Sequence, residues 1–293
     1  MKVLNFGSLN IDYVYEVSDI VAPGETIKAF SRSVFVGGKG LNQSVAMARA
    51  GVNVVHAGCI GEEGDILLRT LEQENVDTRF IRIAEGQGGH TIIQVDKYGQ
   101  NSIIVFGGAN HKITKEHIDT VFQEFTGDDL LVLQNEINNL SYIMEKAASI
   151  GMKIVLNPSP YNDDIGRLPL AMVSYFVVNE IEGIELFEAG SIEEIMPAAL
   201  SKYPGAKIVL TLGENGAWYS GGGESIFQPV FSVKALDTTA AGDCFLGYFV
   251  QGLAEGLPVE QTLKNAAFAS AISVSRKGAA PSIPRMEELA DMI

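Results

Sequence analysis

The run VLNFGSLNID, residues 3–12, joins a short apolar segment to a polar one and sets a pattern that recurs along the chain. Residues 3–6 are typical of a strand that is buried on both faces, as strands are in a parallel sheet covered by helices. Similar apolar runs predict further strands over 54–60, 130–133, 153–156, 175–178 and 208–212.

Helical patterns lie between these strands, over 41–50, 64–74, 141–150, 181–187 and 192–200. Regular alternation of strand and helix predicts βαβ units, in which a mostly parallel sheet carries helices on both faces. No internal repeat, low-complexity tract or long linker interrupts the alternation. We therefore expect one α/β domain over residues 1–293.

Two segments break the alternation, residues 13–36 and 90–106. Both contain period-2 stretches and turn signals, Pro23–Gly24 in the first and Tyr98–Gly99 in the second, which are typical of β-hairpins. Because they are far apart in sequence, we expect them to meet in space as a small β-sheet lid, which covers a site or pairs with a second copy. A plain antiparallel extension of the main sheet is the alternative.

Composition narrows the class of protein. With 293 residues, of which 46% are hydrophobic, the chain is long enough to bury a large core. A formal charge of −15, with no basic run to offset it, repels nucleic acid and anionic membrane surfaces. No apolar run approaches the length needed to cross a bilayer. Cys59 and Cys244 form no paired motif, which favours a reducing compartment, and we expect a cytoplasmic protein.

The segment DTTAAGDCF, residues 237–245, predicts a helix that begins near Ala240. Ala240, Ala241 and Gly242 then offer free main-chain amides at a helix N-terminus, which is a ready anion site. Asp243 follows at once, where a carboxylate can accept a proton from a hydroxyl that attacks a phosphoryl group. An ordinary acidic first turn of a helix explains the segment equally well.

A second segment, VGGKGLNQSVAMARAG at 36–51, places glycines before a helix, where the backbone can approach a ligand closely. Lys39 and Asn42 supply hydrogen-bonding groups there. Lys39 is followed by glycine rather than by Ser or Thr, and no G-x-G-x-x-G follows a strand. A P-loop NTPase and a dinucleotide dehydrogenase are therefore disfavoured.

The polar end of the opening run supplies a third candidate segment. Asn10 and Asp12 alternate with apolar residues, so their side chains point to the same side at the end of a buried strand. Ligands of α/β sheets bind at such ends. A polar loop edge is the structural alternative.

These segments share their order with other motifs: GSLNID (7–12), GGKGLNQ (37–43), VNEIE (178–182), TLGENG (211–216), DTTAAGD (237–243) and SRKGAAPSIP (275–284). Together they resemble the ribokinase family of carbohydrate kinases, the PfkB superfamily, almost from end to end. The resemblance implies a three-layer ribokinase-like fold with a lid. It also implies transfer of the ATP γ-phosphoryl to a sugar hydroxyl, with the 5-hydroxyl of ribose preferred. Fructose, 2-keto-3-deoxygluconate and nucleosides are alternative acceptors within the family, and a non-catalytic sugar-binding regulator is the alternative outside catalysis.

The resemblance also implies roles for individual residues. Asp243 matches the catalytic base, and the amides of Ala240, Ala241 and Gly242 match the anion hole. The residues that match sugar contacts are Asn10, Asp12, Gly38, Lys39, Asn42, Glu136 and Asp243. The residues that match nucleotide contacts are Asn179, Thr211, Gly213, Gly216 and Asn265.

Metal ions and a partner copy are implied in the same way. Asn179 and Glu182 form an N-x-x-E motif, in which Glu182 helps to place Mg2+ through water. A shell for a monovalent cation, usually K+, matches Asp237, Thr239, Ser273, Arg276, Gly278 and Ser282, with main-chain carbonyls doing much of the binding. We expect a homodimer formed through the lid.

Two positions depart from the pattern of the family. His90 stands in the lid where small residues are frequent. Asn135 stands between Gln134 and Glu136 where an apolar residue is common. We expect both departures to lie near the sugar pocket, where one polar group changes sugar preference.

Overall fold

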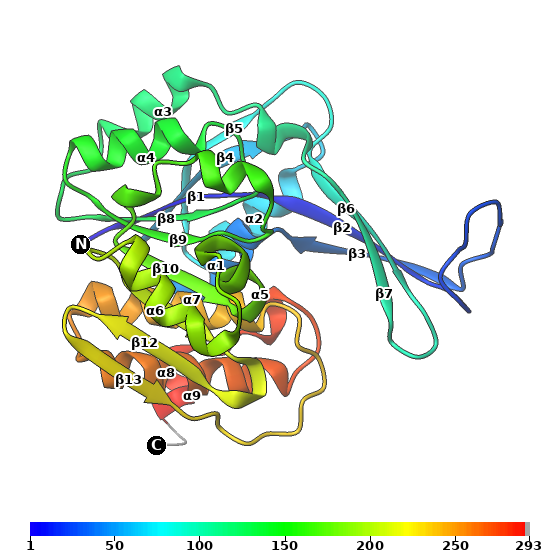
Figure 1. Ribbon diagram of the computed structural model, residues 1–293. Helices are drawn as coiled ribbons and strands as arrows, with labels where there is room; N and C mark the ends of the chain where they lie inside the picture. The colour runs from blue at the N-terminus through cyan, green and yellow to red at the C-terminus, as the bar shows by residue number, and fades with distance from the viewer. Residues whose placement is uncertain (291–293) are drawn as a thin grey trace.

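The computed structural model describes residues 1–290 and consists of a central sheet between two layers of helices (Figure 1). The nine strands of the sheet follow the order β13-β12-β11-β10-β9-β8-β1-β4-β5. Their bounds are β1 (Val3–Phe6), β4 (Val54–Ile60), β5 (Asp77–Ile83), β8 (Leu130–Gln134), β9 (Lys153–Asn157), β10 (Tyr175–Asn179), β11 (Lys207–Thr211), β12 (Ala217–Gly221) and β13 (Glu224–Gln228).

The sheet is parallel from β11 to β5, and only its last two pairings, β11 with β12 and β12 with β13, are antiparallel. All six strands predicted from the sequence form, each within one residue of its expected ends. Periodicity sufficed here because strands buried on both faces must be apolar along their whole length. The predicted α/β class with a mostly parallel sheet is confirmed.

Helices cover both faces of the sheet (Figure 1). One face carries α3 (Lys115–Phe122), α4 (Leu140–Ser149), α5 (Glu180–Phe187) and α6 (Ile192–Lys202). The other carries α1 (Lys39–Arg49), α2 (Asp65–Gln73), α7 (Ala241–Glu255), α8 (Val259–Val274) and α9 (Met286–Ala290). Short 3-10 turns complete the fold at η1 (Gly108–His111), η2 (Asp163–Arg167), η3 (Leu170–Met172), η4 (Gly213–Asn215) and η5 (Ala280–Ser282). Within residues 1–290, no helix combines the length and the apolar character that crossing a bilayer requires.

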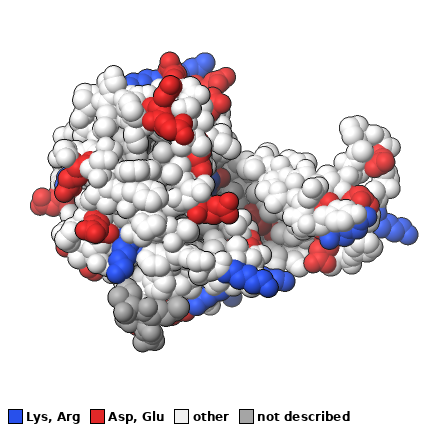
Figure 2. Space-filling model, turned by 60° about the horizontal axis from the view of Figure 1, so that its bottom comes forward, with Lys and Arg blue, Asp and Glu red and all other residues white. Residues whose placement is uncertain are grey.

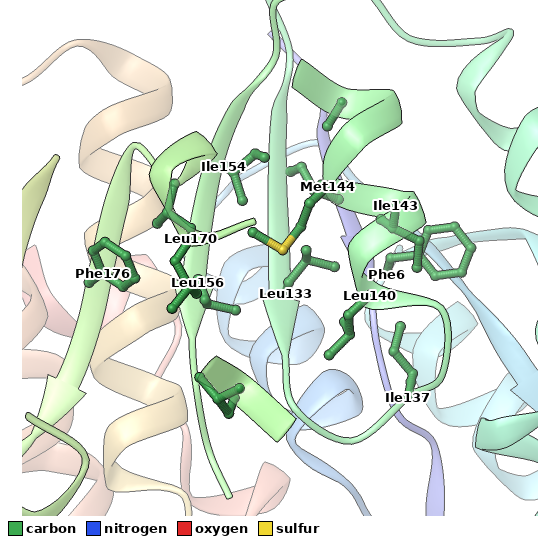
Figure 3. Close-up of a cluster of buried hydrophobic side chains, with 14 of the residues drawn as sticks. Phe6, Leu133, Ile137, Leu140, Ile143, Met144, Ile154, Leu156, Leu170 and Phe176 are labelled. Atoms are coloured by element: carbon green, nitrogen blue, oxygen red, sulfur yellow. The ribbon is translucent and has the colours of Figure 1, made fainter. Parts of the chain in front are cut away.

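Each face of the sheet has its own hydrophobic core. On the α4 side, Leu133 of β8 and Leu156 of β9 pack with Ile143 and Met144 of α4 (Figure 3). Alternate residues of β1 divide between the cores, since Leu4 faces the α4 side and Val3 the α1 side. Asn5 lies on the same side of β1 as Val3, and its polar side chain is completely buried.

The two predicted hairpin segments form a separate four-stranded sheet in the order β3-β2-β6-β7, which we call the lid. Its strands are β2 (Asn10–Glu16), β3 (Ser31–Gly37), β6 (Gly89–Val95) and β7 (Asn101–Phe106). The segments meet through parallel pairing of β2 with β6, as expected, and the alternative of an extension of the main sheet is wrong. The lid reaches out from the body, and Figure 2 shows the hollowed surface between them.

Candidate active site

Asp243 lies in the first turn of α7, and only 6% of its surface is exposed. The residue before the helix, Ala240, has a φ of 60°, which is uncommon for alanine and aims successive amides at one point. The sequence predicted the start of this helix correctly. Of the three amides expected to be free, that of Ala241 donates to the carbonyl of Thr238 (3.2 Å), whereas those of Ala240 and Gly242 have no protein acceptor among the described residues.

Three side chains from the start of α1 surround the carboxylate of Asp243. Asn42 Nδ2 donates to Oδ2 (3.2 Å), and Gln43 Nε2 donates to Oδ1 (2.9 Å). The ammonium of Lys39 lies 3.9 Å from Oδ1. These donors stabilise a buried negative charge that would otherwise be expensive.

Close packing of α1 on the end of β1 makes this arrangement possible. Gly38 has a φ of 90°, a conformation that favours glycine. A Cβ atom on Gly40 would lie 2.3 Å from the amide nitrogen of Ser8. The G-G-K-G segment therefore allows α1 to begin directly against the turn that follows β1.

Glu136, two residues after the end of β8, connects this turn to α1. Its Oε2 accepts the main-chain N–H of Lys39 (3.0 Å) and the hydroxyl of Ser8. Burial and the charge of Asp243 raise the pKa of Glu136 against the opposing effects of Ser8 and Lys39. Partial burial would lower the pKa of Lys39, but the charges of Asp243, Glu136 and Glu182 together raise it.

The lid contributes Asn10 and Asp12, which the structure orients through two residues that sequence reasoning missed. Thr91 Oγ1 donates to Asp12 Oδ1 (2.6 Å), and Asn110 Nδ2 donates to Asn10 Oδ1 (2.7 Å). Burial raises the pKa of Asp12, although the hydrogen bond from Thr91 opposes the shift. Only the register between β2 and β6 shows the first of these contacts, because it places Thr91 directly beside Asp12.

Of the two departures from the family pattern, His90 does not lie on the face of the lid that carries Asp12. Neighbouring residues of a strand point to opposite faces, and Thr91 faces Asp12. His90 therefore lies on the other face of the lid, where its ring packs near those of Tyr13 and Phe106 at centroid distances of 6.0 and 5.0 Å. Asn135 makes no hydrogen bond to Glu136 in the described chain; its Nδ2 donates to the carbonyl of Pro160.

A cavity of about 900 Å3 opens beside Asp243, between α7 and the carboxyl ends of β9, β10 and β11. The predicted residues that line it are Lys39, Asn179, Glu182, Thr211, Gly213, Gly216, Ala240, Ala241, Gly242 and Asp243. Its apolar wall, which sequence reasoning missed, consists of Val230, Phe231, Val233, Ala267, Ala271 and Val274. Asn265 does not line the cavity, because the face of α8 that does so carries residues 267, 270, 271 and 274.

Lys39 and Asp243 line this cavity and also contact the expected sugar residues Glu136 and Asn42. They therefore lie between the two groups of predicted ligands. The residues expected to contact a sugar and those expected to contact a nucleotide meet at the carboxylate of Asp243.

The N-x-x-E segment is a helix cap as well as part of the cavity. Asn179 Oδ1 accepts the N–H of Glu182 (2.9 Å), and Glu182 Oε2 accepts the N–H of Asn179 (3.1 Å). This reciprocal pair satisfies two amides at the start of α5. The other carboxylate oxygen of Glu182, Oε1, has no protein donor within residues 1–290, so it can bind a hydrated cation.

Asp237 joins the loop before α7 to the loop after α8. Its Oδ1 accepts the N–H and the hydroxyl of Thr239, and its Oδ2 accepts the N–H of Gly278 (2.9 Å). Burial would raise the pKa of Asp237, but these hydrogen bonds more than offset it and the pKa is lowered.

The other residues of the expected monovalent-cation shell lie nearby: Ser273 in the last turn of α8, Arg276 in the loop after it, and Ser282 in η5. The hydroxyls of Ser273 and Ser282 bond to each other (2.8 Å), and the guanidinium of Arg276 pairs with Glu288. Their side chains are thus already engaged, and a cation here would depend on main-chain carbonyls. In the described part of the chain, no main-chain N–H donates to the carbonyl oxygens of Thr239, Arg276 or Gly278. These three oxygens can therefore bind a monovalent cation.

Comparison with known proteins decides the family. The sequence pattern of the pfkB family of carbohydrate kinases matches residues 1–286. The chain belongs to this family. It is 33% identical to a ribokinase of Haemophilus influenzae over 98% of this chain and 96% of that protein.

Solved structures agree with this assignment. The fold matches ribokinase from Thermotoga maritima with a TM-score of 0.89 and 35% identity over 99% of this chain and 98% of that one. It matches Arabidopsis thaliana ribokinase, solved with ribose and ATP, with a TM-score of 0.87 and 27% identity over 99% and 97% of the two chains. This pfkB protein is therefore a carbohydrate kinase with the ribokinase-like fold.

The raised pKa of Glu136 has a consequence for stability. A carboxyl whose pKa is higher in the folded than in the unfolded protein stabilises the fold at low pH, and this contribution is lost as the pH rises through the raised value. We predict that Glu136→Gln is more stable than the wild type at neutral pH, and that the difference shrinks as the pH falls toward 4.5, the ordinary pKa of glutamate.

Thermal or urea unfolding of the ligand-free protein at several pH values measures this difference. Glu145→Gln, an exposed position on α4, is the matched control and should leave the pH dependence unchanged. A Glu136→Gln protein that is less stable than the wild type at pH 7 would contradict the prediction, because it would show that the ionised carboxyl stabilises the fold.

Proposed function

We propose that this pfkB kinase transfers the γ-phosphoryl group of ATP to the 5-hydroxyl of D-ribose, with Asp243 as the general base. The observation that carries the proposal is the position of the Asp243 carboxylate. It is buried at the N-terminus of α7, between the cavity and the polar residues of the lid and α1. A base at this point can take the proton of a hydroxyl that attacks a phosphate held at the helix.

The phosphoryl group needs donors where charge develops during transfer. The free amides of Ala240 and Gly242 and the positive end of the α7 dipole supply them. The amide of Ala241 joins them when its bond to the carbonyl of Thr238 opens. Lys39 adds a positive charge 3.9 Å from the base, at the same end of the cavity.

The sugar side of the site is rich in oriented polar groups. Asn10, Asp12 and Glu136 each have one oxygen engaged by a protein donor, which leaves other atoms for hydroxyls. Asn42 Oδ1 is buried and has no hydrogen-bond partner within the described chain, so a hydroxyl donor would satisfy it. A small polyol such as ribose suits these groups, together with the main chain at Gly38. The Haemophilus and Thermotoga relatives, both ribokinases, support ribose among such sugars.

The nucleotide fits the opposite end of the cavity. Thr211 ends β11, and Gly213 and Gly216 follow it; all three line the cavity, and Asn179 pairs with Thr211 in the sheet. The apolar wall around Phe231 and Ala271 suits a flat base.

We infer two cations. Asn179 and Glu182 would hold Mg2+ through its water ligands, and the ion would neutralise charge on the transferred phosphates. Main-chain carbonyls of the two loops joined by Asp237 would hold K+. A cation there would fix the loop that leads into Ala240, and so the amides of the anion hole, without touching the sugar.

We also propose that the whole chain acts as one unit whose lid closes over the sugar and pairs with a second copy. The lid face that bears Asp12 exposes Phe35, Ile103 and Val105, all at least half exposed. An apolar sheet face of this kind is expected to be covered by a partner. A cytoplasmic location suits the two buried, unpaired cysteines, Cys59 and Cys244.

A panel of acceptors tests the function. With MgATP and K+ present, we expect ribose to give a higher kcat/KM for ADP release than fructose, 2-keto-3-deoxygluconate, adenosine or inosine. A nucleoside that outperforms ribose would overturn the choice of acceptor. A ribose-induced thermal shift without ADP release from any acceptor would indicate a sugar-binding regulator.

The role of the base has a separate test. Asp243→Asn should lower kcat by roughly a hundred- to ten-thousandfold, the usual contribution of a positioned base, because the hydroxyl proton loses its acceptor. ATP binding, measured by calorimetry, should change little. Asp128→Asn, an exposed position, is the matched control. Near-normal turnover by Asp243→Asn would refute the assignment.

The dimer is tested by charge in the lid. Ile103→Asp should convert a dimer to a monomer, because an unpaired carboxylate would be buried in the interface. Ile83→Asp places the same charge at a comparably exposed position on β5 and should not change the mass measured by sedimentation. A wild-type monomer, or an Ile103→Asp dimer, would contradict a lid interface.

A further inference from the structure

A chain of buried polar side chains runs inward from Asp243 and plays no part in the mechanism above. Asn5, His56 and Gln134 lie on three adjacent strands, β1, β4 and β8, and each is at most 1% exposed. The register of the sheet sets Asn5 directly beside His56. All three lie on the face of the sheet that α1 covers, where apolar side chains would fill the same space at lower cost.

This series of hydrogen bonds starts at Gln43, which donates to Asp243 from α1, as Asn42 does. The Oε1 of Gln43 accepts Nε2 of Gln134 (2.7 Å), and the same Nε2 donates to Oδ1 of Asn5 (2.9 Å). Asn5 Nδ2 in turn donates to the hydroxyl of Ser44 on α1 (2.8 Å). Four buried side chains thus connect the proposed base to the centre of the sheet.

His56 is at the far end of this series of hydrogen bonds. Ser44 Oγ lies 2.8 Å from its Nδ1, and its Nε2 lies 3.3 Å from the carbonyl oxygen of Gly7. A carbonyl accepts but cannot donate, so Nε2 carries the proton. Burial lowers the pKa of His56 to about 4, so the ring is neutral near pH 7 and Nδ1 is an acceptor. Ser44 therefore donates a hydrogen bond from its hydroxyl to Nδ1 of His56 and accepts one from Nδ2 of Asn5.

The direction of every bond in the chain is set from both ends. At one end, an ionised Asp243 can only accept, so Gln43 must present its NH2 group. At the other end, Asn5 Nδ2 also donates to the carbonyl of Gly40 (2.7 Å), so Asn5 must turn its carbonyl oxygen, Oδ1, toward Gln134. Gln134 must then present its NH2 group to Asn5 and to Gln43. A reversed Gln43 would turn its carbonyl toward the carboxylate, and would also set its NH2 group against that of Gln134. Two independent sets of acceptors demand the same orientation.

We propose that Gln43 is a positioning residue for Asp243 and that the buried relay of Gln134, Asn5, Ser44 and His56 keeps its donor end turned toward the base. The relay touches neither sugar nor nucleotide. It acts by holding one carboxylate oxygen of Asp243 in place, so that the other faces the incoming hydroxyl. The inference rests on the proposed role of Asp243 as base.

The first experiment removes the donor. Gln43→Met keeps the length of the side chain, and we expect kcat to fall about 10- to 100-fold, the range for a lost hydrogen bond to a charged group, with the KM values for ribose and ATP within about threefold of wild type. The acid limb of the kcat profile should move to higher pH, because the lost bond favours the charged carboxylate. Gln251→Met, the same change at a buried position on α7, is the control and should retain the wild-type profile.

The second experiment tests the relay by a double-mutant cycle. Gln134→Met removes the donor to Oε1 of Gln43, so the amide is held only through its Nε2, by Asp243 and by Asn157 Oδ1 (3.2 Å), and kcat should fall about 3- to 30-fold. In a Gln43→Met background the same change should have little further effect, because the amide that it orients is gone. Equal factors in both backgrounds, or no effect of Gln134→Met on kcat, would overturn the relay.

Two further readouts separate the possible failures. If Gln134→Met does not unfold cooperatively, Ser44→Ala replaces it in the cycle, since that change removes a single hydroxyl. Failure of the proposed function appears in the wild type, as absence of phosphoryl transfer or as full activity of Asp243→Asn. Failure of the relay appears only in the ratios among the Gln43 and Gln134 variants.

Discussion

The carboxylate of Asp243 links two helices that lie about 200 residues apart in the sequence. A buried charge is tolerated only when donors surround it, and these donors come from the first turn of α1. The start of α1 must therefore lie against the start of α7. That requirement explains the tight packing of Gly40 on Ser8. It also places the proposed sugar residues and the cavity proposed for the nucleotide on two sides of one carboxylate.

The same constraint gives the site its charge balance. The chain as a whole carries a formal charge of −15, which repels a nucleotide at a distance. Attraction must then be local, and the structure provides it through the N-terminus of α7 and through Lys39. Three carboxylates raise the pKa of Lys39, and two of these, Asp243 and Glu136, belong to the proposed sugar side. The positive charge thus lies where the two proposed substrates would meet.

The parts of the site that could be predicted from the sequence are those encoded by short segments. The start of α7, the position of Asp243 in its first turn and the close approach at the G-G-K-G segment depend on neighbours within a few residues. Prediction was less successful where a contact crosses strands. Thr91 and Asn110, which orient Asp12 and Asn10, carry no signal in their own segments. Only the strand register shows that His90 lies on the face of the lid opposite to Asp12. Polar residues in the apolar runs 3–6 and 54–60 were a signal that was available, but it does not say what they bond.

The sequence by itself determined the α/β class, the segments of the lid and the candidate base, because periodicity, capping preference and glycine placement act over one or two turns of chain. Only the tertiary structure decided that Asp237 ties two loops together, that Ala241 is already bonded to Thr238, and that a line of amides leads from Asp243 to His56. These features depend on the register between strands and on which side chains meet across helices. Both are set by packing among residues that are distant in the chain, so no local pattern contains them.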